Sequence, residues 1–218
     1  MSAELAGFAH NFLPGEPDGS GVTLLLLHGT GGNEDDLIPL GQQLLPGAAI
    51  LSPRGKVSEH GAPRFFRRLA EGVFDHEDLL LRTHELADFV DQATNQYGFD
   101  RQKLVAVSYS NGANIAASLM LLHPDLLRAA VLFRAMVPFE PEETPDLSGV
   151  PVFLAAGRRD TMISPDNTER LAAILQEAGA DLDLRWKNTG HPLTYEEIEE
   201  AREWLPRVLN PNGDQTTQ

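Results

Sequence analysis

The chain has 218 residues, of which 42% are hydrophobic, and it carries a formal net charge of −15. This length suits one large α/β domain or two small ones, and the composition is that of an ordinary globular protein. The excess of acidic residues disfavours binding to phosphate backbones or anionic membranes, because both depend on clustered Lys and Arg. The lack of cysteine excludes disulfides, thiolate metal sites and a cysteine nucleophile.

The N-terminal stretch MSAELAGFAHNFLPGE has neither the basic nor the apolar region of a secretory signal. No apolar run reaches the length that crosses a bilayer. We therefore expect a cytoplasmic protein without nucleic-acid partners and without integral membrane association.

Apolar runs alternate with helical patterns along the chain, which is typical of a mostly parallel sheet with helices on both faces. In chain order, buried strands are predicted at residues 22–27, 48–51, 104–108, 129–133, 150–156 and 182–186. Helices are predicted after a cap at Asn33, over residues 77–97, 111–122 and 165–178, and in a last segment with Ile198 and Trp204 on its apolar stripe.

Two connections, residues 54–75 and 134–149, show little periodicity and follow the C-terminal ends of predicted strands. Open α/β sheets bind their ligands at that edge, so these connections are candidate substrate-lining loops. No linker divides the chain. We predict a single α/β domain over residues 1–209 and a polar, frayed tail over residues 210–218.

The stretch VSYSNGANIA, residues 107–116, lies where a buried strand ends and a buried helix begins. It resembles the nucleophile elbow G-x-S-x-G of serine hydrolases, with Ser110 as the nucleophile and Ser108 in place of the first glycine. The positions on either side must be small because strand and helix crowd together. A frame centred on Ser108 would shorten the strand and leave Gly112 without a role, so we favour Ser110.

Two further residues fit a serine triad. Asp160 follows the strand at 150–156, and His191 follows the strand at 182–186 within NTGHPL. The chain order Ser110, Asp160, His191 is that of an α/β-hydrolase triad, in which the carboxylate orients the histidine and the histidine takes the serine proton. Surface or packing roles are expected for His10, His60, His76, His84 and His123, and no metal site is predicted.

The segment HGTGGN, residues 28–33, follows the first long apolar strand. It supplies glycine-flanked backbone N–H groups at the C-terminal edge of the sheet, so Thr30 and Asn111 are the candidate backbone donors of an oxyanion hole. A phosphate-binding role is disfavoured, because the chain has neither G-x-x-x-x-G-K-[ST] nor G-x-G-x-x-G at this position.

Together, LLLLHGTGGNEDDLIPL, SYSNGANIA, AAGRRDTMISP and NTGHPL resemble the phospholipase/carboxylesterase family of α/β-hydrolases, which includes acyl-protein thioesterases. The resemblance covers about residues 22–209, and RFFRRLAEGVFD at residues 64–75 is similar to the bacterial carboxylesterase branch. It implies an α/β-hydrolase fold without a large cap domain and without a cofactor. It also implies Ser110 as nucleophile, Asp160 and His191 as its partners, and Thr30 and Asn111 as oxyanion donors.

The expected activity is hydrolysis of small to medium carboxylic esters, with a small-molecule ester as the partner. An acyl-thioesterase or lysophospholipase with the same triad, a catalytically silent ligand-binding protein, and a homodimer stay open. The apolar loop residues either line an acyl or aromatic pocket or seal the core: Phe65, Phe66, Phe74, Met136, Val137, Phe139, Met162 and Ile163. Four arginines either bind an anionic substrate group or, as we favour, pair with Glu71, Asp75 or other acidic neighbours: Arg64, Arg67, Arg68 and Arg134.

Overall fold

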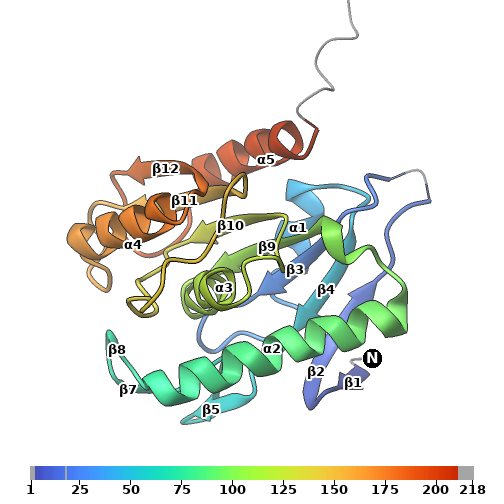
Figure 1. The fold of residues 1–218 in the computed structure, drawn as a ribbon, viewed down its shortest axis with the longest axis horizontal. Coiled ribbons are helices and arrows are strands. Elements are labelled where there is room, and N and C mark those ends of the chain that lie inside the picture. The colour runs from blue at the N-terminus through green and yellow to red at the C-terminus, as the bar shows by residue number, and fades with distance from the viewer. Residues whose placement is uncertain (1–2, 18, 211–218) are drawn as a thin grey trace, which may run out of the picture.

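The computed structural model describes residues 3–17 and 19–210, which form a mostly parallel eight-stranded sheet with helices on both faces (Figure 1). The predicted fold class is confirmed. The strand order is β1-β2-β4-β3-β9-β10-β11-β12, and only the pairs β1–β2 and β2–β4 are antiparallel in this sheet. The strands are β1 (Ala3–Leu5), β2 (Phe8–Leu13), β3 (Thr23–Leu27), β4 (Ala49–Pro53), β9 (Leu104–Tyr109), β10 (Ala129–Phe133), β11 (Pro151–Gly157) and β12 (Asp181–Lys187).

The six predicted strands all appear, with ends shifted by at most two residues. Strands β1 and β2 were not predicted, because their burial alternates or is partial and neither forms a continuous apolar run. Two short hairpins in the connection 54–75 were not predicted either. These pair β5 (Val57–Glu59) with β6 (Ala62–Arg64) and β7 (Arg68–Ala70) with β8 (Val73–Phe74).

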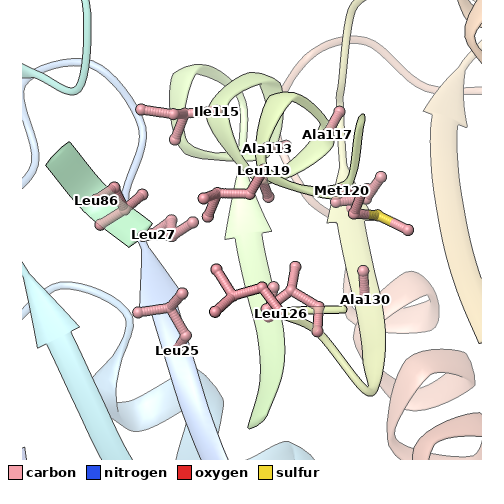
Figure 2. Close-up of a cluster of buried hydrophobic side chains, with 14 of the residues drawn as sticks. Leu25, Leu27, Leu86, Ala113, Ile115, Ala117, Leu119, Met120, Leu126 and Ala130 are labelled. Atoms are coloured by element: carbon pink, nitrogen blue, oxygen red, sulfur yellow. The ribbon is translucent and has the colours of Figure 1, made fainter. Parts of the chain in front are cut away.

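Alternate residues of the central strands pack on opposite faces of the sheet, as the period of a strand requires. Leu25 and Leu27 of β3 face one cluster, whereas Leu24 and Leu26 face the other. The first cluster lies under α2 (His76–Tyr97), α3 (Asn111–Leu122) and α4 (Pro165–Glu177). Figure 2 shows part of it, with Leu119 of α3 close to the β3 leucines. The second cluster lies under α1 (Ile38–Leu44) and α5 (Tyr195–Leu209).

The helix expected to begin at Asn33 begins later, so that prediction was wrong. The Asn33 side chain accepts a hydrogen bond from the backbone of Asp35 at 2.7 Å, which forms a local turn instead of a helix cap. Helix α1 starts only at Ile38, with Pro39 in its first turn, where a proline suits a helix start. Among the described helices, none is both long and apolar enough to cross a membrane. Of the predicted tail, only Asn210 lies within the described residues.

The junction between β9 and α3 is a single residue, Ser110. Its φ of 53° and ψ of −115° place it in a backbone conformation that L-residues rarely adopt. Two residues later, a Cβ on Gly112 would lie 2.0 Å from the carbonyl oxygen of Leu27 and 2.6 Å from that of His28. The first turn of α3 therefore packs directly on the end of β3, and only glycine fits there.

We expect Gly112→Ala to lower the free energy of unfolding by about 3 kcal/mol, because the new methyl group overlaps backbone that cannot move independently. Gly149→Ala is the matched control. Gly149 has a φ of 74°, and a methyl group added there would have no atom within 4 Å, so only the left-handed backbone penalty of about 1 kcal/mol applies. Urea unfolding of both variants measures the difference, and equal losses would contradict the packing argument.

Candidate active site

Ser110 lies at the carboxyl edge of the sheet, where the parallel strands β3, β9, β10 and β11 end. Its backbone N–H donates to the carbonyl of Phe133 at the end of β10, at 2.9 Å. Ser108, two residues earlier, is fully buried, and its hydroxyl donates to the carbonyl of Val131 at 3.0 Å. A serine therefore fits the usual glycine position here because its one polar group has a partner within the sheet.

Two hydrogen bonds connect three side chains that are far apart in the sequence. The hydroxyl of Ser110 lies 2.9 Å from Nε2 of His191, and Nδ1 of His191 lies 2.8 Å from Oδ2 of Asp160. Asp160 follows β11, and His191 lies in the loop between β12 and α5. The structure thus brings together the three residues that were predicted to form a triad.

The carboxylate of Asp160 is held on both sides. Its Oδ1 accepts hydrogen bonds from the backbone N–H groups of Met162, at 2.8 Å, and Ile163, at 3.3 Å. Its other oxygen contacts His191, and the side chain is only 2% exposed. A carboxylate fixed in this way holds the imidazole in one orientation, with Nδ1 carrying the proton and Nε2 free to accept one.

Thr30 and Asn111 line the same cavity as Ser110, and each carries a backbone N–H group. Within residues 3–17 and 19–210, neither group donates to a protein acceptor. Asn111 is the first residue of α3, so its N–H lies at the positive end of the helix dipole. Its side chain is anchored separately, because Oδ1 accepts from the N–H of Phe65 at 2.7 Å. Both groups are therefore free to donate to an oxygen of a bound molecule.

A role for His28 was not predicted, although it is the first residue of HGTGGN. Its buried ring donates from Nδ1 to the carbonyl of Gly29 at 2.7 Å and accepts at Nε2 from the N–H of Gly55 at 3.0 Å. Burial lowers the pKa of His28, against the opposing effects of the Gly29 carbonyl and nearby carboxylates, which keeps the ring neutral. The Gly29 carbonyl and the Thr30 N–H belong to the same trans peptide and point in opposite directions. The hydrogen bond from His28 to that carbonyl therefore also orients the N–H of Thr30.

A cavity of about 40 Å³ adjoins Ser110. Four of the predicted pocket residues line it: Phe74, Met136, Met162 and Ile163. Phe65 and Phe66 do not, which corrects the prediction. They are 2% and 0% exposed and pack in the core, and the N–H of Phe65 donates to Oδ1 of Asn111, which anchors this segment to the start of α3. Val137 and Phe139 also pack against this core outside the cavity lining.

The four loop arginines all have acidic partners, as we favoured, although Glu71 is not among them. Arg64 and Arg68 both contact Glu59, at 3.3 Å and 2.9 Å. Arg67 pairs with Asp75, and Arg134 pairs with Glu197. Arg64 also donates to the hydroxyl of Thr30 at 2.6 Å and lines the cavity, which gives one wall a cationic side chain.

The remaining histidines lie away from Ser110. His10 is buried, with its Nε2 2.6 Å from the hydroxyl of Tyr97, and the rings of His84 and His123 contact each other at 3.0 Å. In the part of the chain that the structure describes, no three His, Asp or Glu side chains are grouped so that they could hold a metal ion.

The chain is similar to known hydrolases over most of its length. The sequence profile of the Dienelactone hydrolase family matches residues 60–203. The putative hydrolase MhqD of Bacillus subtilis is 50% identical over 186 residues, which cover 85% of this chain and 93% of that protein.

Two carboxylesterase crystal structures are similar in fold as well as sequence. The Bacillus cereus enzyme is 49% identical, with a TM-score of 0.90, over 92% of this chain and 94% of that one. The enzyme from Mesorhizobium loti is 32% identical, with a TM-score of 0.86, over 94% of this chain and 96% of that one.

The family match includes the elbow at Ser110 and the loops that carry Asp160 and His191. The similarity to two carboxylesterase structures agrees with the resemblance derived from the four sequence motifs. The protein has the α/β-hydrolase fold, and the chain belongs to the dienelactone hydrolase family.

Proposed function

We propose that the protein is a serine carboxylesterase that hydrolyses small to medium carboxylic esters through an acyl-enzyme on Ser110. The observation that carries this proposal is the hydrogen-bonded chain from Asp160 through His191 to Ser110, with contacts of 2.8 and 2.9 Å. The carboxylesterases among its relatives support the same reaction class.

In the first half of the proposed reaction, the Ser110 hydroxyl attacks the ester carbonyl while Nε2 of His191 takes its proton. The backbone N–H groups of Thr30 and Asn111 donate to the oxyanion that forms on the carbonyl oxygen. Asp160 keeps the proton on Nδ1 and stabilises the imidazolium. When the tetrahedral intermediate collapses, the C–O bond to the leaving alcohol breaks, and His191 returns its proton to the alcohol oxygen.

In the second half, a water molecule attacks the acyl carbonyl on Ser110, and His191 takes one proton from the water. The bond between the acyl carbon and the serine oxygen then breaks, and the same proton returns to Ser110. The carboxylic acid leaves, and the enzyme is restored without any other reactant. The reaction therefore uses side chains and backbone groups of this chain alone.

The lining of the cavity suits an acyl group that presents apolar atoms beside the reacting carbonyl. Phe74, Met136 and Ile163 supply apolar walls, and Arg64 supplies a polar one. This mixed lining matches the small to medium esters proposed above, and an acyl-chain series run beside thioester and lysophospholipid substrates separates the alternatives. A silent ligand-binding protein would have no need for the hydrogen-bonded triad.

We expect Ser110→Ala to lower kcat for p-nitrophenyl acetate by four or more orders of magnitude, because the attacking hydroxyl is removed. The matched control is Ser108→Gly, which removes a buried hydroxyl at the same elbow but leaves the nucleophile. It is expected to keep most of the activity. If Ser108→Gly lost activity and Ser110→Ala kept it, the wrong serine would have been assigned. A wild-type protein inert toward a panel of esters and thioesters would contradict the proposal itself.

We expect kcat/KM to fall toward acid pH, because a protonated His191 cannot take the Ser110 proton. His28 is the less suitable source of this effect, since burial lowers its pKa and its ring nitrogens are occupied by Gly29 and Gly55. Stopped-flow ester hydrolysis between pH 5 and 9, at about equal ionic strength, measures the profile. Activity that stays constant to pH 5 would contradict a histidine base.

A further inference from the structure

The loop that carries His191 is attached to the rest of the molecule through a run of backbone carbonyls. Each carbonyl of residues 188–192 accepts a hydrogen bond from outside the loop. Arg159 donates to the carbonyls of Asn188 and Thr189. Arg134 donates to those of Gly190 and Pro192, and the Tyr109 hydroxyl donates to that of His191. The position of the imidazole therefore depends on the donors that hold the carbonyls beside it.

Arg134 donates on both sides of His191. Its Nε–H donates to the carbonyl of Gly190 at 3.1 Å, and Nη2 donates to that of Pro192 at 3.2 Å. The remaining N–H groups donate to the carbonyl of Ala155 at 3.2 Å and to the two carboxylate oxygens of Glu197 at 2.6 and 2.9 Å. These five contacts match the five N–H donors of a guanidinium. Arg134 thus has no donor left for a substrate, although it lies beside the cavity.

The partner of Arg134 is fixed in turn by the start of α5. Glu197 is the third residue of that helix, and it forms a capping box with Thr194, whose N–H and hydroxyl both contact Oε2 of Glu197. Burial works to raise the pKa of Glu197, but the hydrogen bonds from Arg134 and Thr194 outweigh it, and the pKa lies below its usual range. The pair is therefore ionised, with both side chains 0% exposed.

A buried ion pair is weak evidence for a role in stability, since its desolvation offsets much of its attraction. Its contacts here point to a different role. The turn that carries Arg134 also supplies the Phe133 carbonyl to the N–H of Ser110, and the N–H of Arg134 donates to Ala155 in the strand before Asp160. Arg134 adopts a φ of 58°, unusual for a non-glycine residue, and it lies 4.0 Å from Asp160. Arg134 thus lies beside the segments that carry all three members of the proposed triad.

We infer that Arg134 is a positioning residue, which sets the distance between His191 and Ser110 through the carbonyls of Gly190 and Pro192. The inference rests on the serine esterase activity proposed above. Its guanidinium is needed for this role because lysine has only three donors and no planar fork that reaches both sides of the loop. The role is distinct from substrate binding, which would use free donors.

The test compares Arg134→Met with Arg134→Lys, and with Arg82→Met as the control. Arg82 also forms ion pairs, with Asp78 and Glu85 on α2, but it does not contact the triad. For p-nitrophenyl acetate we expect kcat to fall by about 100-fold in both Arg134 variants, the usual result of misplacing a reacting group by about 1 Å. KM is expected to change little, and Arg82→Met is expected to keep the wild-type kcat.

A second measurement does not depend on turnover. In the wild type, the Nδ1 proton of His191 is shared with Asp160 and is expected to give a downfield proton NMR signal. We expect this signal to broaden or disappear in the Arg134 variants, while the remaining spectrum shows a folded protein. The signal and kcat of Arg82→Met are expected to match the wild type.

Arg134→Met leaves Glu197 buried without its partner, so the double variant Arg134→Met with Glu197→Gln keeps the test independent of that lone charge. Glutamine preserves the capping box. The same loss of kcat and of the downfield signal in the folded double variant would support the inference. An intact downfield signal in the Arg134 variants, with kcat within threefold of the wild type, would overturn the inference. A rise in KM with unchanged kcat, or unfolding of every Arg134 variant, would overturn it as well. An inactive wild type would contradict the proposed function instead.

Discussion

The arrangement at the carboxyl edge of the sheet depends on the backbone of Ser110, which forms the whole connection between β9 and α3. Its positive φ turns the chain sharply enough for α3 to cross back over β3, where only the missing side chain of Gly112 permits contact with Leu27. The parallel strands on either side then bring HGTGGN, Asp160 and His191 to that edge.

His28 and Arg134, two buried polar side chains beside the site, are paired so that they hold loops rather than compete for the ligand. His28 connects the Gly29 carbonyl to Gly55, and Arg134 connects the His191 loop to α5 through Glu197. Among the residues that the structure describes, the backbone N–H groups of Thr30 and Asn111 keep free donor capacity, and so does the buried Nδ2 of Asn111. Stabilisation of a developing negative charge requires such preorganised donors, because donors that must reorient give up much of their benefit.

Much of the fold, and the meeting of Ser110, Asp160 and His191 at one edge of the sheet, could be predicted because both follow from local sequence features. The buried parallel strands are continuous apolar runs, and Ser110, Asp160 and His191 each follow one of them in the expected order. The edge strands β1 and β2 and the hairpins of residues 57–74 could not be predicted, since they are short and only partly buried. The inward orientation of Phe65 and the five contacts of Arg134 depend on segments distant in the sequence. No local pattern encodes them.

The proposed mechanism requires covalent attack by Ser110, and mass spectrometry of the protein quenched in acid during turnover of p-nitrophenyl acetate can detect the resulting acyl-enzyme. The predicted result is a mass increase of one acetyl group, located on the peptide that contains Ser110, and no increase in Ser110→Ala. Acetylation of the active protein only at another residue, or ester turnover that persists in Ser110→Ala, would contradict covalent attack by Ser110.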